Sequence, residues 1–211
     1  MDCTASMGPW IANAKTRMVE LTNQVQVEHP DANILTAFVG YRDYGDREPL
    51  MTVPFQPTGS TMAQIQQVEA EGGDDIAEDV AHGLEAALHQ DWSDAEVKIV
   101  FHIADAPAHG MAFHTLHVSD RFPRGDPDGF DPRDFVERMS FLDIHFTFVK
   151  IHNSTDTMIE VLHNCYTHGG TFSVIDLRRQ GVPLGDITLV NDELTRSISE
   201  TITHYTSSQA L

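Results

Sequence analysis

The sequence predicts an α/β fold in which a three-layer, doubly wound and mostly parallel sheet carries helices on both faces. Amphipathic helical segments alternate with short apolar runs along the chain, which is the order that parallel strands with crossover helices produce. Runs such as residues 97–101 are apolar on both faces, as buried parallel strands are. The chain has 211 residues, of which 41% are hydrophobic. We therefore expect a single domain over residues 1–211, because this length can bury one substantial core.

Each element is predicted from hydrophobic periodicity and from the residues that start or stop it. Pro9 suits the first turn of a helix, where no backbone donor is needed, and Pro30 ends that helix. Pro54 restricts the second strand to an edge of the sheet, since proline lacks a backbone N–H. The expected helices cover residues 9–28, 62–69, 76–89, 132–142, 154–167 and 192–205, and the expected strands cover residues 34–41, 51–55, 97–103, 144–151 and 171–177.

The segment before the first polar loop is shorter than this fold requires. A doubly wound sheet needs a strand ahead of a loop such as residues 2–6, and only Met1 precedes that loop. We therefore expect a domain that lacks most of its first central strand. A degenerate domain, with a sheet that is open or completed by another chain, is the corresponding alternative.

The charge of the chain limits its partners. The net charge is −19, from 13 basic and 32 acidic residues. Such a surface repels phosphate groups and anionic lipid, so we expect no nucleic-acid partner and a protein partner instead. No run is long enough to span a membrane, and no signal peptide opens the chain. The two cysteines, Cys3 and Cys165, cannot form a disulfide framework, which favours a cytoplasmic location.

Three polar clusters fall where the carboxyl ends of strands are expected. In an extended turn, alternate residues point the same way, so Asp2, Thr4 and Ser6 can converge. Glu78 and Asp105 come from two further loops. All five side chains offer oxygen, which Mg²⁺, Mn²⁺ and Ca²⁺ prefer. The sequence therefore predicts a hard-cation site with Mg²⁺ as the first choice, open to an acidic side chain of a protein partner.

Other acidic and histidine residues surround the predicted ligands. We expect Asp74, Asp75 and His109 to support the site from outside the set that touches the ion. Taken singly, the acidic residues also fit helix starts and turns, where a carboxylate is favourable without any metal. Their order at three predicted strand ends is what favours a metal site.

These stretches resemble the von Willebrand factor A (vWA) domains that accompany alpha-kinases. The resemblance rests on residues 1–8, 38–46, 72–80 and 101–110, with residues 122–127 and 155–158 also similar. The spacing of Asp2, Thr4 and Ser6 is similar to the metal-ion-dependent adhesion site of that family. The resemblance implies a Rossmann-like vWA fold, a bound divalent cation and protein binding without catalysis.

The second of the three polar loops, which carries Glu78, departs from the pattern of many vWA domains. Many members carry a threonine there, whereas this chain offers Glu78, similar to the acidic version in integrin β subunits. Asp74 and Asp75 stay open as alternative ligands, with Glu78 favoured.

Two other functions stay open at this stage. A metal-assisted hydrolase needs a base beside the ion and a closed pocket. It would be built on the same acidic loops or on His102, His109, His114 and His117, whose spacing matches no common zinc motif. A regulatory fragment of a serine/threonine protein kinase is the second alternative. The chain has no phosphate-binding glycine-rich loop with its lysine, so it would contribute no kinase domain of its own.

Overall fold

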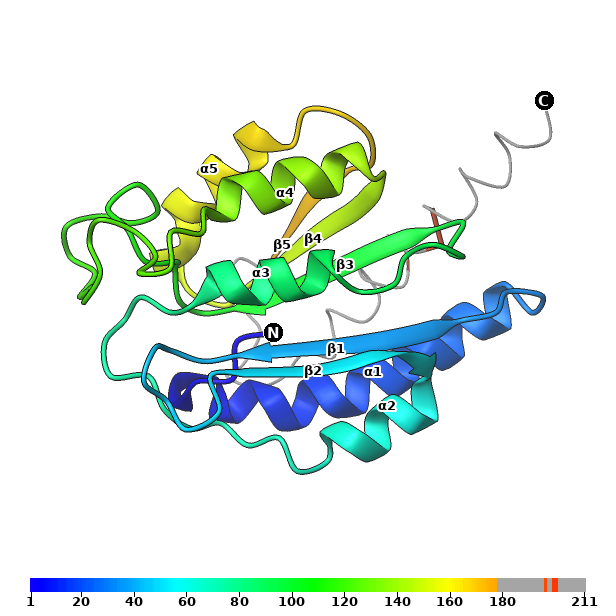
Figure 1. The fold of residues 1–211 in the computed structure, drawn as a ribbon. Coiled ribbons are helices and arrows are strands. Elements are labelled where there is room, and N and C mark those ends of the chain that lie inside the picture. The colour runs from blue at the N-terminus through cyan, green and yellow to red at the C-terminus, as the bar shows by residue number, and fades with distance from the viewer. Residues whose placement is uncertain (178–195, 197–198, 201–211) are drawn as a thin grey trace.

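The computed structural model describes residues 1–177, 196 and 199–200, which form a mixed α/β domain (Figure 1). Three strands pair in parallel in the order β3-β4-β5, and two further strands, β1 and β2, pair antiparallel. The strands are β1 (Leu35–Tyr41), β2 (Leu50–Pro57), β3 (Lys98–Ala104), β4 (Ile144–Lys150) and β5 (Phe172–Asp176).

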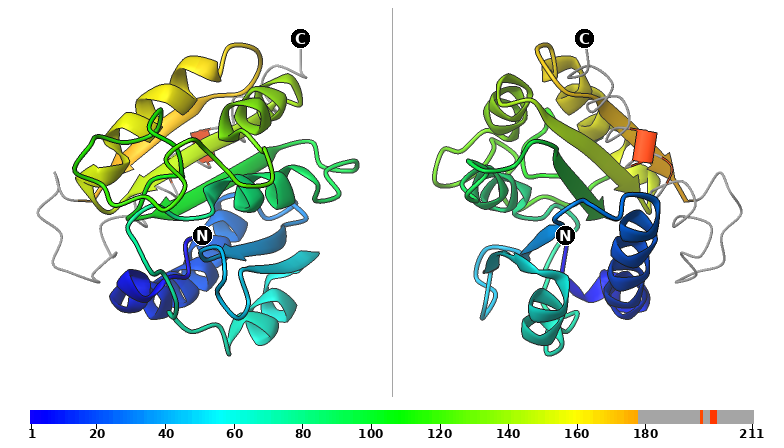
Figure 2. Two further views of the ribbon diagram at one scale, coloured as in Figure 1. Left: turned by 60° about the vertical axis from the view of Figure 1, so that its left-hand side comes forward. Right: turned by 90° about the vertical axis from the view of Figure 1, so that its right-hand side faces the viewer.

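Helices cover both faces of this arrangement (Figure 2). Residues of α3, α4 and α5 share one buried cluster with β1, β3 and β4, and residues of α1 and α2 share the other with β1, β2, β4 and β5. The predicted doubly wound α/β fold is therefore confirmed. The helices are α1 (Gly8–Glu28), α2 (Thr58–Ile65), α3 (Val80–Leu88), α4 (Pro132–Phe141) and α5 (Asp156–Cys165), with 3-10 turns at Ala5–Met7 and Asn153–Thr155.

The two buried clusters lie on opposite faces because side chains alternate along each strand. In β4, Phe146 and Phe148 belong to the cluster under α3, α4 and α5, while Val149 belongs to the cluster under α1 and α2. All three side chains are at most 2% exposed. A strand buried on both faces needs apolar residues at consecutive positions, which is the pattern visible in the sequence.

The first three residues lie between β1 and β3 and join the two sheets. Tyr41 in β1 donates its N–H to the carbonyl of Met1 at 3.1 Å and accepts from the N–H of Cys3 at 2.8 Å. On the other side, the N–H of Asp2 donates to the carbonyl of Ile103 in β3 at 3.0 Å. These residues occupy the place where the sequence predicts the end of the first central strand. The loop that follows them therefore starts beside the ends of both β1 and β3.

Most predicted elements are confirmed to within two residues. Pro9 lies in the first turn of α1, and exposed Pro54 lies in β2, which pairs with β1 alone within the described sheets. No helix of the described residues combines the length and the apolarity that a membrane crossing requires. The helix expected over residues 192–205 falls largely outside the described residues.

Two predicted helix bounds are wrong. The helix expected from residue 76 begins only at Val80, because Glu78 and Asp79 give their N–H groups to the carbonyls of Pro107 and Arg42. The helix expected over 62–69 runs from Thr58 to Ile65, and the residues after it turn back toward the first loop. Before α3, long-range backbone bonds thus replace a helical turn. After α2, the carbonyls of Gln66 and Val68 instead accept from the ammonium group of Lys15.

Gly83 allows α3 to lie directly against β1. A Cβ atom built at Gly83 would stand 2.4 Å from Cδ1 of Tyr41. We expect Gly83→Ala to lower the free energy of unfolding by about 1–3 kcal/mol through overpacking, measured by urea denaturation. Gly59→Ala in α2 is the matched control, since nothing lies within 4 Å of its added Cβ. Equal denaturation midpoints for the two variants would contradict this close approach.

Candidate metal centre

The first loop turns around the carboxylate of Asp2. Thr4 donates to Oδ1 of Asp2 twice, from its N–H at 2.9 Å and from its hydroxyl at 2.7 Å. An aspartate that accepts from the backbone two residues later forms a tight local turn. The hydroxyl oxygens of Thr4 and Ser6 are 3.3 Å apart. Asp2 and Thr4 are buried and Ser6 is exposed, so the turn opens to solvent at Ser6.

Asp105 reaches the same loop from the carboxyl end of β3. The Ser6 hydroxyl donates to Oδ1 of Asp105 at 3.0 Å. The backbone carbonyl of Asp105 accepts from the hydroxyl of Ser154 at 2.7 Å, which anchors the loop to the segment before α5. Asp2 and Asp105 meet because the N-terminal segment and β3 end side by side.

Glu78 approaches from the second loop. Its N–H donates to Pro107 at 2.9 Å, and it forms a parallel bridge with Ala108. A Cβ atom at Gly73 would lie 2.8 Å from Oε1 of Glu78 and 3.2 Å from Cβ of Thr4. Gly73 has a φ of 80°, which favours glycine and leaves room for the two side chains. The structure thus brings Glu78 and Thr4 to the same point.

Two carboxylate oxygens in this cluster are buried without a hydrogen-bond partner, Oδ2 of Asp2 and Oε2 of Glu78. Burial raises the pKa of Asp2 to about 7, and the charge of Asp105 adds to the effect. Burial likewise raises the pKa of Glu78 to about 10, with Asp2 adding to it. Buried anions without counter-charge are unfavourable. The five predicted ligands therefore form a group of oxygen donors that is short of positive charge, which is a chemistry that suits a hard cation.

Arg42 ties together the segments that carry these ligands. It is 2% exposed, and its guanidinium donates to the carbonyls of Cys3 at 3.4 Å, Glu48 at 2.9 Å and Glu69 at 3.1 Å. An ion pair with Glu71 at 3.3 Å adds to these bonds. A planar guanidinium can serve several acceptors at once. The first loop is thereby fixed against the β1–β2 connection and the segment after α2.

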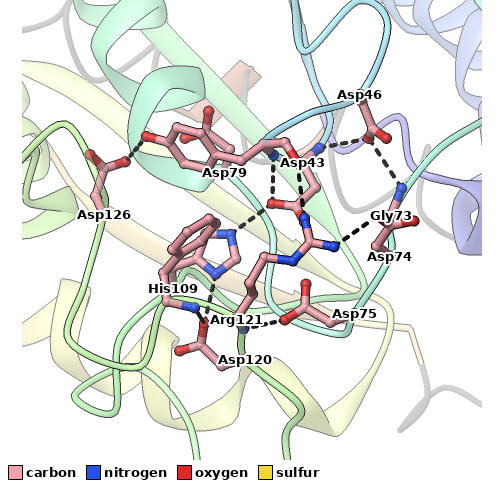
Figure 3. Close-up of polar contacts among 12 residues, drawn as sticks. Asp43, Asp46, Gly73, Asp74, Asp75, Asp79, His109, Asp120, Arg121 and Asp126 are labelled. Atoms are coloured by element: carbon pink, nitrogen blue, oxygen red, sulfur yellow. Dashed lines mark hydrogen bonds and ion pairs between the residues drawn. The ribbon is translucent and has the colours of Figure 1, made fainter.

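The three residues expected to support the site, Asp74, Asp75 and His109, make different contacts (Figure 3). Asp74 is exposed and pairs with the Arg121 guanidinium at 2.8 Å. Oδ2 of Asp75 accepts from the backbone N–H of Arg121. His109 is buried, with its two ring nitrogens directed at the carboxylates of Asp43 and Asp120.

Asp43, Asp46 and Asp120 also lie in this region, although the sequence predicts no role for them. Oδ2 of Asp46 accepts from the N–H of Gly73 at 3.1 Å and from that of Asp43 at 2.9 Å, so it shapes the second loop. Asp43 could have been found, because it follows the end of a predicted strand in the same way as Asp105 does. Asp120 lies in a long loop without periodicity, and nothing in the sequence singled it out.

Three of the histidines considered for a zinc site, His102, His109 and His114, belong to two separate networks. His102 lies in β3, where its Nε2 is 2.7 Å from the hydroxyl of Tyr41. His109 and His114 instead share the two oxygens of Asp120 at 2.8 Å each. His102 therefore shares no hydrogen-bond network with His109 and His114, which disfavours a zinc site built from these histidines alone.

No family model matches the chain. Among curated proteins, the chain is similar to the alpha-protein kinase vwkA of Dictyostelium discoideum, with 32% identity over 164 residues. The match covers 76% of this chain and 26% of that protein. The chain thus spans about a quarter of the length of this relative.

Solved structures, one of them of a VWA domain, share the fold. The SpRpn10 VWA domain matches with a TM-score of 0.51 at 10% identity, over 82% of this chain and 84% of that one. The chain has a von Willebrand factor A fold. The pilus adhesin SpaC from Lactobacillus rhamnosus GG matches this vWA domain with a TM-score of 0.60 at 10% identity, over 97% of this chain and 30% of that one. Proximal thread matrix protein 1 from the mussel byssus matches with a TM-score of 0.53 at 10% identity, over 94% and 44%.

Arg42 offers a test of how this vWA domain holds its first loop. Arg42→Lys keeps the charge but cannot reach three separate carbonyls, so we expect a loss of about 1–3 kcal/mol in the free energy of unfolding, measured by urea denaturation. Arg133→Lys is the control, because Arg133 is half-exposed and pairs with its neighbour Asp131; it should cost less than about 1 kcal/mol. Similar losses in both variants would contradict the anchoring role of Arg42.

Proposed function

We propose that this vWA domain is a divalent-cation-dependent protein-binding module. Asp2, Thr4, Ser6, Glu78 and Asp105 would hold Mg²⁺, with Mn²⁺ or Ca²⁺ as alternatives. The observation that carries the proposal is the pair of unpartnered buried oxygens, one on Asp2 and one on Glu78. Both belong to the group of side chains that surrounds the Thr4 hydroxyl, and a hard cation would satisfy both.

The geometry favours binding at the solvent edge of the site. Mg²⁺ takes six oxygen ligands in near-octahedral arrangement, and the chain supplies five side chains. Ser6 is exposed and Asp105 is half-buried, so an open position would face solvent on their side. Water or an acidic side chain of a protein partner would complete the coordination there.

A metal-assisted hydrolase is less well supported. Such an enzyme needs a general base that can accept a proton from water. His109 directs both ring nitrogens at carboxylates, at 2.7 and 2.8 Å, and is 3% exposed. It is therefore engaged and shielded. The same reasoning favours an interaction module over an enzyme.

The similarity to an alpha-protein kinase suggests a setting for this module. We infer that the chain is related to a targeting, scaffold or regulatory part of such a protein, since the similarity spans 26% of the relative. A cytoplasmic location is part of this proposal. Cys3 is buried and Cys165 is half-buried, and both are free thiols, which suits a reducing compartment.

Calorimetric titration of the chelator-treated protein with Mg²⁺ and Mn²⁺ tests the metal site. We expect saturable binding in the wild type. Asp2→Ala and Asp105→Ala should each weaken it by about 10-fold or more, because each removes an oxygen ligand. Asp94→Ala removes an exposed carboxylate just before the amino end of β3, opposite the end that carries Asp105, and should leave the affinity unchanged. Absence of binding, or equal affinity in all four proteins, would remove the proposal.

A peptide array tests the nature of the partner. Peptides that contain aspartate or glutamate should bind in Mg²⁺ and be released by chelator. Matched peptides with asparagine or glutamine should not bind, because an amide is a poorer ligand than a carboxylate for a hard ion. The Asp105→Ala variant is the protein control. If the peptides with aspartate or glutamate still bind selectively in chelator, the ion does not mediate recognition.

A further inference from the structure

A second group of potential metal ligands, visible in Figure 3, includes Asp43, whose charge also acts on Glu78 of the proposed centre. Asp75, His109 and Asp120 each offer one ligand atom within 4.8 Å of the others. Asp43 joins this group, since its Oδ1 is 2.7 Å from Nε2 of His109. The four residues come from the end of β1, the second loop and the long loop after β3, and none is among the five ligands proposed above.

Two oxygens in this group are buried without a hydrogen-bond partner. They are Oδ2 of Asp43 and Oδ1 of Asp75, and Asp43 as a whole is 1% exposed. The other oxygen of each carboxylate is engaged, by His109 for Asp43 and by the N–H of Arg121 for Asp75. Burial, followed by the proximity of Asp43, raises the pKa of Asp75. The two carboxyl groups thus lie against each other, and each has one buried oxygen that no N–H or hydroxyl group serves.

Asp120 holds the His109 ring in place from the opposite side. Its Oδ1 is 2.8 Å from Nδ1 of His109 and accepts from the N–H of Phe122 at 2.7 Å. Its Oδ2 accepts from the N–H of Gly110 and lies near Nε2 of His114, both at 2.8 Å. A carboxylate behind one histidine nitrogen is the arrangement that orients the other nitrogen toward a metal ion. Nε2 of His109 points at Asp43, where the free oxygens are.

We propose that Asp43, Asp75 and His109 form a second divalent-cation site, with Asp120 as a positioning residue for the histidine ring. The ion would replace the proton shared between Nε2 of His109 and Asp43. One nitrogen and two carboxylate ligands favour Zn²⁺ or Mn²⁺ over Mg²⁺, which prefers oxygen alone. This site is chemically distinct from the oxygen-only site and does not depend on it.

Zinc titration of the Asp105→Ala variant tests the proposal without interference from the first site. We expect this variant to bind one Zn²⁺, with a nitrogen ligand visible by X-ray absorption spectroscopy. Adding His109→Gln should weaken the Zn²⁺ affinity by about 10-fold or more, because a nitrogen ligand is lost. His163→Gln, an exposed histidine of α5, is the matched control and should change nothing.

Asp75→Asn keeps the test meaningful if His109→Gln disturbs folding. Asp75 is half-buried, and asparagine can still accept from the N–H of Arg121, so the fold should survive while Zn²⁺ binding weakens. If Asp105→Ala binds no Zn²⁺, or if neither substitution changes its affinity, the group is a hydrogen-bond network alone and the proposal is wrong. Zn²⁺ binding in Asp105→Ala together with no Mg²⁺ binding in the wild type would remove the proposed function and leave this site standing.

Discussion

The backbone pairing of Met1–Cys3 between β1 and β3 is the constraint on which the site depends. Through these hydrogen bonds, two sheets that are otherwise separate become neighbours. The ends of both strands then lie beside the first loop, and Asp2 is brought to the loop that holds Asp105. Loops at the carboxyl ends of strands are where doubly wound folds build their sites. Without this pairing, the side chains of the proposed centre would have no common point.

Several carboxylates are buried at this edge of the sheet, and the basic side chain buried near them does not neutralise them. Arg42 is a buried cation there, but its donors go to backbone carbonyls and to Glu71. Asp2, Asp43 and Glu78 are each at most 3% exposed, and each keeps one oxygen without a partner. A folded chain leaves such groups unsatisfied only at a cost. This imbalance is the physical basis for both proposed cation sites.

The fold and the proposed function are supported by different observations. The solved structures that match the chain are 10% identical to it. Similarity at that level establishes the fold alone. A fold of this kind serves many functions, so function has to be argued from the site. Here the argument comes from side chains of this chain, such as the hydroxyls of Thr4 and Ser6 between two carboxylates.

The amino-acid sequence alone was enough to predict the architecture and part of the candidate site. Alternating apolar runs and amphipathic helices predicted the doubly wound sheet, because buried residues recur along the chain at the period of the helix or strand that carries them. Asp105 was also predictable because it follows a predicted strand, and Asp2 because of its spacing with Thr4 and Ser6.

Which side chains come into contact depends on how the loops pack in three dimensions. Glu78 approaches Thr4 because its backbone bonds to Pro107 and because Gly73 leaves room between them. The contact between Asp43 and His109 joins residues that are 66 positions apart. Such contacts depend on how loops pack against one another over long distances, and hydrophobic periodicity carries no record of that packing.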